Sequence, residues 1–192
     1  MTELTITGIC QLLEAHGAER LERSSVTLLE HALQTAWLAE RATASASLVC
    51  ACLLHDLGHV LSDAASATDT GAGRHDQHGA ACLSSLFDAA VTEPVRLHVS
   101  AKRYLCYAHP GYAHGLSADA RHSLERQGGV FSAAEARAFM QEPYAIDAVN
   151  LRLWDDQAHR PGLSTPSLAH FAATLRRCVL PKHVLAPSGP RS

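Results

Sequence analysis

Leu53-Leu54-His55-Asp56-Leu57-Gly58-His59 closes the longest unbroken apolar run of the chain, which begins at Leu48. Such a run is typical of a buried helix, so His55 and Asp56 are expected at its inner end. Together they offer one imidazole nitrogen and two carboxylate oxygens, and those oxygens can bind two metal ions at once. Nitrogen and oxygen donors suit iron, manganese or zinc, and the lack of a cysteine ligand argues against a thiolate zinc site.

A single His-Asp pair does not by itself establish a metal site, because such a pair can simply cap a buried helix. Further histidines and an aspartate on other segments favour the metal site, and these are His31, His75, His98 and Asp155. Thirteen histidines in 192 residues are also the outlier in the composition.

Length and composition favour one all-α domain spanning residues 1–192, with a frayed tail at about 187–192. Apolar residues make up 47 % of the chain and aromatic residues only 5 %, and alanine and leucine dominate. Small helix-forming residues with few β-branched runs predict a helical core. Strands with a period of two are not apparent.

Charge and cysteine usage exclude several classes of function. The net charge is -3 and the basic residues form no stripe, so we expect no nucleic-acid binding. No signal peptide or membrane span is expected, since the apolar run from Leu48 to Leu54 is too short. The scattered cysteines, none in a CxxC pattern, indicate reduced thiols in a soluble cytoplasmic protein.

Periodicity and capping residues predict six to nine helices. The expected elements are residues 2–16, 26–44, 47–56 ended by Gly58, 76–88, a helix opened by Thr92 and Pro94, one capped by Ser117, one capped by Ser132 with Glu135, 143–158, and one opened by Thr165 and Pro166.

The order of the candidate ligands, H…HD…H…H…D, resembles the HD-domain superfamily of metal-dependent phosphohydrolases. The local strings at 30–36, 53–59, 74–80, 98–105 and 151–156 are similar, more narrowly, to the di-iron oxygenases of phosphonate degradation. That similarity continues through Pro161-Gly162-Leu163 and the helix at 165–166, so it covers nearly the whole chain. Myo-inositol oxygenase is a weaker relative with the same ligand order.

The resemblance implies an HD-type helical bundle with a di-metal centre in its core. One iron would be bound by His31, His55, Asp56 and Asp155, and the other by Asp56, His75 and His98, so that Asp56 bridges the two. An Fe(II)/Fe(III) pair with dioxygen as co-substrate would cleave the C–P bond of a small organophosphonate, preferably a 1-hydroxy compound, and release phosphate.

Two of these ligand assignments have close competitors. His78 competes with His75, and we prefer His75 because the family places its ligand four residues before Gly-Ala, here Gly79-Ala80. Asp156 competes with Asp155, which is preferred because it lies three residues after Arg152. An exposed polar face is the expected setting of Asp156 and His159.

His59, Lys102 and Arg152 resemble the substrate-binding and catalytic residues of the family. A buried phosphonate needs fixed cations and directed N–H donors. Lys102 lies one turn after His98, and Arg152 one turn before Asp155, so both cations share a helix face with a candidate ligand.

At two positions the chain departs from the family pattern. Leu21 and Ser24 occupy the places where the family has a tyrosine that closes on the second iron and a glutamate that pairs with a substrate ammonium. The missing carboxylate argues against an amino-bearing substrate.

Two other functions remain open from the residues alone. An HD-type phosphohydrolase acting on a small phosphate ester or nucleotide would use the same ligands with metal-bound hydroxide. A metal-stabilised helical binding module would have a closed coordination shell, against which Lys102 and Arg152 argue. The oligomeric state is not predicted.

Overall fold

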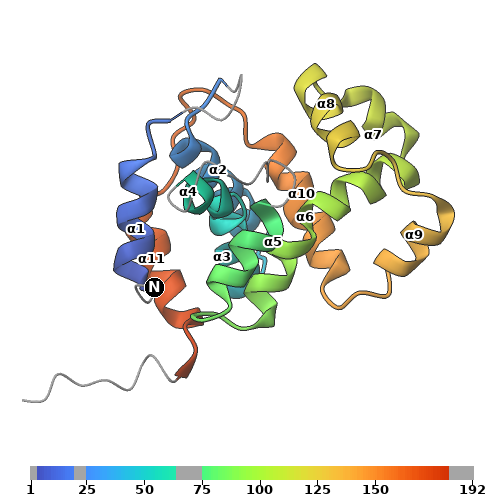
Figure 1. Ribbon diagram of the computed structural model, residues 1–192. Helices are drawn as coiled ribbons and strands as arrows, with labels where there is room; N and C mark the ends of the chain where they lie inside the picture. Colours follow the sequence, from blue (N-terminus) through green and yellow to red (C-terminus); the bar gives the residue numbers. More distant parts are fainter. Residues whose placement is uncertain (1–3, 20–24, 64–74, 182–192) are drawn as a thin grey trace, which may run out of the picture.

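Eleven α-helices and no extended strand make up residues 4–19, 25–63 and 75–181, the ranges described by the computed structural model (Figure 1). They are α1 (Ile6–Ala15), α2 (Leu28–Arg41), α3 (Ala46–Leu54), α4 (Leu57–Asp63), α5 (His75–Leu83), α6 (Ala89–Ala108), α7 (Pro110–Gly115), α8 (Ala118–Arg126), α9 (Ala133–Phe139), α10 (Ala145–Gln157) and α11 (Leu168–Cys178). The predicted all-α domain is confirmed, whereas six to nine helices was too few. Leu21, Ser24 and the tail at 187–192 lie outside the described residues.

The core is built around α3, which is apolar on every side. Its residues from Leu48 to Leu54 are all buried, with α2, α6 and α11 packed around them. Ser45 caps the helix by accepting a hydrogen bond from the Leu48 backbone N–H. Burial of each leucine contributes roughly 1.5–3 kcal/mol. The helix therefore delivers His55 and Asp56, at its C-terminal end, into the interior.

Gly58 does not end a helix, contrary to the prediction. The helix before it ends at Leu54 with His55 as its C-cap, and Gly58 is the second residue of α4. A β-carbon at Gly58 would lie 1.9 Å from the backbone oxygen of His75. Glycine is therefore needed because α4 and the start of α5 touch through their backbones.

α6 is one long helix and does not begin at Thr92, as predicted. Asp88 caps it by accepting from the Ala90 N–H, and Pro94 lies inside the second turn. The Thr92 hydroxyl donates to the Asp88 carbonyl instead of acting as a cap. α6 ends at Ala108, directly before His109-Pro110.

α10 packs against α6 and begins at Ala145, two residues later than predicted, after Tyr144 in a left-handed conformation. The helices α7, α8 and α9 lie on the right of Figure 1, and α7 and α9 both pack against α6. Ser132 and Glu135 form the predicted capping box of α9. Among the described helices none has the length and apolar character needed to cross a bilayer.

Arg103 holds the turn that follows α8. Its guanidinium donates to the backbone oxygens of Gly128 and Gly129, stacks on the Phe131 ring and pairs with Glu135. Its neighbour Lys102 faces the interior. Two adjacent residues of α6 therefore have different roles: Arg103 fixes the turn after α8, and Lys102 points into the interior.

Candidate functional site

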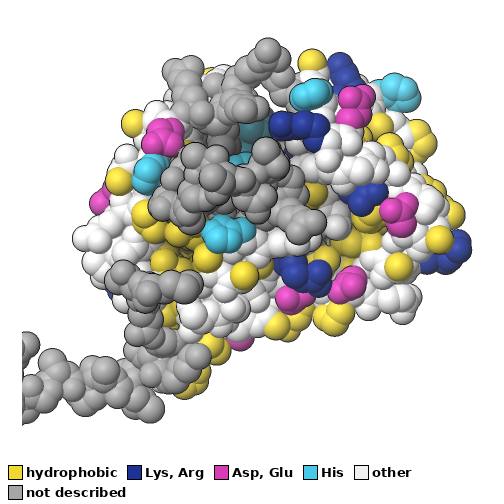
Figure 2. Space-filling view, viewed as in Figure 1, with side chains coloured by type: hydrophobic (Ala, Val, Ile, Leu, Met, Phe, Trp, Pro, Cys, Tyr) yellow, Lys and Arg dark blue, Asp and Glu magenta, His cyan; other side chains and the backbone are white. Residues whose placement is uncertain are grey.

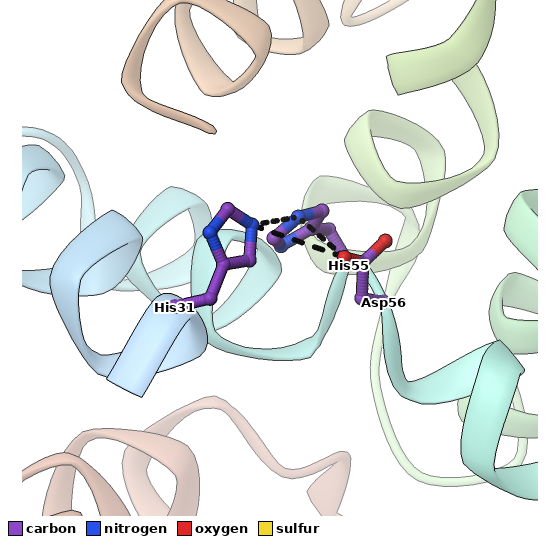
Figure 3. A group of neighbouring side chains, drawn as sticks. All are labelled: His31, His55 and Asp56. Atoms are coloured by element: carbon purple, nitrogen blue, oxygen red, sulfur yellow. Dashed lines mark hydrogen bonds and ion pairs between the residues drawn. The ribbon is translucent and has the colours of Figure 1, made fainter. Parts of the chain in front are cut away.

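Four helices and the junction between two others bring the six predicted metal ligands to one place in the interior. α2 supplies His31, the junction of α3 and α4 supplies His55 and Asp56, and α5, α6 and α10 supply His75, His98 and Asp155. Figure 3 shows His31 reaching across from its helix to His55 and Asp56. These side chains are separated by up to 124 positions in the sequence, so only the fold can assemble them.

The first half of this cluster has two imidazoles and two carboxylates. The Nε2 atoms of His31 and His55 lie 3.3 Å apart. Asp155 Oδ1 lies 3.1 Å from His31 Nε2 and 3.8 Å from His55 Nε2. Asp56 Oδ2 completes the group at 3.8 Å and 3.4 Å from the same two nitrogens.

The second half shares Asp56 through its other oxygen. Asp56 Oδ1 lies 3.7 Å from His75 Nε2 and 3.9 Å from His98 Nε2, and these nitrogens are 3.2 Å apart. Each oxygen of Asp56 therefore faces a different pair of imidazoles. This is the arrangement that a carboxylate bridge between two metal ions requires.

The tautomers of the histidines fit metal binding. His31, His55 and His98 each place Nδ1 at 2.7–2.9 Å from a backbone carbonyl oxygen, of Ala158, Cys52 and Val95 respectively. A carbonyl only accepts, so Nδ1 carries the proton and Nε2 of the neutral ring presents a lone pair.

When both rings are neutral, the Nε2 lone pairs of His31 and His55 face each other at 3.3 Å and repel unless a cation lies between them. The Nε2 atoms of His75 and His98 lie 3.2 Å apart. Ligands about 2.1 Å from one metal ion lie roughly 3.0–3.4 Å apart, which is close to these separations. The donor set, all nitrogen and oxygen, suits iron, manganese or zinc.

The charges of the centre are strongly coupled. Burial acts to raise the pKa of Asp56, but His55, His59 and His75 outweigh it and hold the pKa well below its usual range. Burial lowers the pKa of His75 to about 4 and that of His98 well below the usual range. Burial also acts to lower the pKa of His55, but Asp56 and Asp155 outweigh it and raise that pKa to about 9. The centre therefore favours an ionised Asp56 carboxylate with neutral His75 and His98, while His55 carries positive charge that a bound metal ion would replace.

A cavity of about 150 Å³ opens beside the cluster. Besides five of the candidate ligands, its walls are formed by His59, Val99, Lys102, Ser123, Gln127, Arg152 and His159. The three residues predicted to bind the phosphonate, His59, Lys102 and Arg152, all line it. Lys102 and His98 on one helix, and Arg152 and Asp155 on another, all line the cavity, as their helical spacing predicted.

Lys102 lies one turn after His98 on α6 and is buried, with 4 % of the residue exposed. Its Nζ donates to Ser123 Oγ at 3.3 Å. Burial, together with the nearby Arg152, lowers the pKa of Lys102 to about 8. The ammonium is therefore poorly solvated and available to an anion.

Arg152 lies one turn before Asp155 on α10 and donates to it from Nη1 at 2.6 Å. Nη2 donates to Asp156, and Nε donates to the Tyr112 hydroxyl at 3.3 Å. Burial opposes the charge, but the two aspartates outweigh it and hold the pKa of Arg152 well above its usual range.

The competing ligands lie apart from the centre. His78 Nε2 contacts Cys82 Sγ at 3.8 Å on the outer side of α5. Asp156 turns to Arg152 and is half-buried, so the expectation of an exposed face is wrong for it. His59 stacks on His75 with the ring centroids 3.9 Å apart.

Sequence reasoning missed several residues of the site. His159 was assigned to an exposed face and does keep an exposed edge, but its ring stacks on His31 at 4.7 Å and lines the cavity. Tyr112, Ser123 and Gln127 were not singled out. Ser123 and Gln127 lie four residues apart on one helix face, which was the available signal.

Comparison with known proteins identifies relatives over most of the chain. The HD domain family model matches residues 28–127. Hydroxymethylphosphonate dioxygenase from Gimesia maris is 41 % identical over 177 residues, which are 91 % of this chain and 88 % of that protein. The [1-hydroxy-2-(trimethylamino)ethyl]phosphonate dioxygenase (glycine-betaine-forming) from Leisingera caerulea is 36 % identical over 170 residues, which are 88 % of this chain and 87 % of that protein.

Proposed function

The chain belongs to the HD domain family, and from that premise we propose that it is a di-iron oxygenase that cleaves the C–P bond of a small 1-hydroxyphosphonate. The observation that carries the proposal is the position of Asp56 between two pairs of imidazoles, beside the buried Lys102 and the partly buried Arg152. The names of both relatives support an oxygenase acting on a phosphonate.

The six residues described above would bind two iron ions, which when bound supply the redox chemistry that activates dioxygen. His31, His55 and Asp155 would bind one ion and His75 and His98 the other, with Asp56 between them. Backbone carbonyls orient three of the imidazoles, and this second layer of contacts fixes the ligand atoms before the metal arrives.

Lys102 and Arg152 would bind the phosphonate oxygens, because both cations line the cavity, Lys102 fully buried and Arg152 partly buried. Hydrogen bonds to charged groups contribute about 1.5–3 kcal/mol each. His59 and Ser123 are further donors at the same wall. These groups would place the carbon that bears phosphorus next to the metal ions and exclude water from it.

The atoms balance without an external reductant. Hydroxymethylphosphonate and one O₂ together contain the atoms of formate, phosphate and one proton. The C–P bond breaks, carbon gains an oxygen, and phosphorus leaves as phosphate. A longer 1-hydroxyphosphonate would give the corresponding carboxylate.

The lining of the cavity favours a substrate without an ammonium group. Among the described residues its only carboxylates are Asp56 and Asp155, which face the imidazoles and Arg152. A quaternary ammonium would find no other acidic partner at this wall. We therefore place hydroxymethylphosphonate first among the candidate substrates.

The experiment is phosphate release from hydroxymethylphosphonate by iron-loaded protein, in air and under strict anaerobiosis. We expect phosphate and formate in equal amounts, only in air and only with iron. Phosphate release that continues without oxygen, or that zinc restores in metal-stripped protein, would instead indicate the hydrolytic chemistry of an HD-type phosphohydrolase.

A further inference from the structure

We propose that Tyr112 and Asp156 are positioning residues that hold Arg152 so that each of its terminal nitrogens offers one N–H to the substrate. This inference rests on the proposed function, because it assigns the geometry with which Arg152 meets the phosphonate. Neither residue lines the cavity, and both act through the guanidinium.

The guanidinium is held on three sides. Nη1 donates to Asp155, Nη2 donates to Asp156, and Nε donates to the Tyr112 hydroxyl. The Tyr112 hydroxyl in turn donates to Asp156 Oδ2 at 2.5 Å. Tyr112, Asp156 and Arg152 therefore form a closed ring of hydrogen bonds between α7 and α10.

Counting the N–H groups of Arg152 shows how many donors remain for a ligand. Guanidinium has five N–H groups, one on Nε and two on each terminal nitrogen. The contacts above use one on each nitrogen. No other acceptor for Arg152 occurs in the part of the chain that the structure describes, which leaves one N–H on Nη1 and one on Nη2. One donor on each terminal nitrogen can serve two oxygens of a phosphonate.

Charge at this wall also depends on the ring. Asp155 and Asp156 both pair with Arg152, while Lys102 makes no ion pair with a carboxylate of the described residues and donates to the Ser123 hydroxyl. Because the charge of Arg152 is compensated by carboxylates, Arg152 mainly orients the phosphonate through its N–H groups. Lys102 supplies the uncompensated positive charge. Tyr112 is well suited to bridge the ring, because its hydroxyl accepts from Arg152 and donates to Asp156 at once.

The test is a double-mutant cycle with inorganic phosphate as the probe. Its affinity for the iron-loaded protein is measured by calorimetry without oxygen, alongside KM and kcat for hydroxymethylphosphonate. Tyr112→Phe should weaken phosphate binding about fivefold and raise KM similarly, because the hydroxyl that accepts from Arg152 and donates to Asp156 is lost. Iron content and kcat should change little. Tyr107→Phe, on the exposed end of α6, is the matched control and should be silent.

The cycle is completed in the Arg152→Ala background, where Tyr112→Phe should have no further effect because Tyr112 acts only through Arg152. An equal effect in both backgrounds, or none in the native protein, would overturn the inference while leaving the proposed function intact. Unchanged phosphate affinity in Arg152→Ala itself would overturn the anion-binding role of Arg152, and this inference with it.

Asp156→Ala is a second test variant, for which a positioning role and a charge-masking role predict opposite changes in phosphate affinity. Loss of positioning should weaken phosphate binding, again only when Arg152 is present. If Asp156 merely masked the charge of Arg152, its removal would strengthen phosphate binding, and that result would overturn the inference. Thermal unfolding of each variant separates these effects from loss of the fold.

Discussion

The side-chain amide of Gln34 makes hydrogen bonds to both the backbone N–H and the backbone carbonyl of Arg160. The Gln34 Nε2 donates to the Arg160 carbonyl at 2.8 Å, and its Oε1 accepts from the Arg160 N–H at 3.0 Å. Two residues earlier, the Ala158 carbonyl accepts from His31 Nδ1. α2 is therefore joined to the segment after α10 through two residues one turn apart, one of which is the candidate ligand His31.

Gln34→Ala should lower both stability and iron affinity. It leaves two backbone groups of Arg160 without their partners, at a cost of about 1–3 kcal/mol, and frees the segment that orients His31. Chemical denaturation and iron titration measure the two effects. Gln157→Ala removes an exposed side-chain bond to Leu153 and should change neither. Equal behaviour of the two variants would contradict the proposed role of the pair.

Asp56→Ala should lose both metal ions, because each of its oxygens faces a different pair of histidines. Protein produced with iron should contain close to two ions per chain, and the variant close to none, by elemental analysis. Asp147→Ala, on α10 but outside the cavity lining, should retain both ions. A full complement of iron in Asp56→Ala would disprove the bridge.

KM for the phosphonate should rise as the pH passes about 8, because the pKa of Lys102 lies there and only its protonated form attracts the anion. Below that pH the ammonium is charged and KM should be flat. Lys102→Met should have a high KM that no longer changes between roughly pH 7 and 9. A native KM that is constant across this range would show that Lys102 does not bind the substrate.

Gly58→Ala should destabilise the fold and displace His75. The new methyl group would overlap the His75 backbone oxygen, and a backbone atom cannot turn aside as a side chain can. A change of this kind costs about 1–3 kcal/mol or more. Gly111→Ala is the control, since a β-carbon there meets nothing within 4 Å. Thermal melting of both variants decides, and equal melting temperatures would refute the contact.

Substrate preference should follow the absence of a spare carboxylate among the described lining residues. Turnover of hydroxymethylphosphonate should exceed that of [1-hydroxy-2-(trimethylamino)ethyl]phosphonate, and 2-amino-1-hydroxyethylphosphonate should show no advantage over analogues without the amine. Competition assays measuring phosphate release compare them directly. A strong preference for an ammonium compound would point to an acidic partner elsewhere, such as Glu22, which lies outside the described residues.

The cluster of His and Asp residues was predictable because its members stand in local strings that can be read in order. Residue order and family resemblance named all six side chains that meet, and helical spacing placed Lys102 with His98. That these residues bind iron stays a prediction, which metal analysis will test.

Contacts between distant backbones were not predictable. Gly58 looked like a helix end, since local propensity says nothing of the His75 carbonyl that lies against it. Thr92 and Pro94 looked like a helix start, but Asp88 caps the helix one turn earlier. The bond between Tyr112 and Asp156 joins two helices and leaves no periodic trace in the sequence.

The spacing between candidate ligand and cation along two helices limits the length of substrate that the site can bind. His98 and Lys102 are four residues apart on α6, and Arg152 and Asp155 are three apart on α10. At 1.5 Å per residue, these are rises of about 6 Å and 4.5 Å. A methylene inserted between phosphorus and the carbon that bears the hydroxyl would lengthen the substrate by about 1.5 Å, which is a sizeable fraction of either rise. On the proposed function, 2-hydroxyethylphosphonate, which carries its hydroxyl on the second carbon, would thus be a poor substrate.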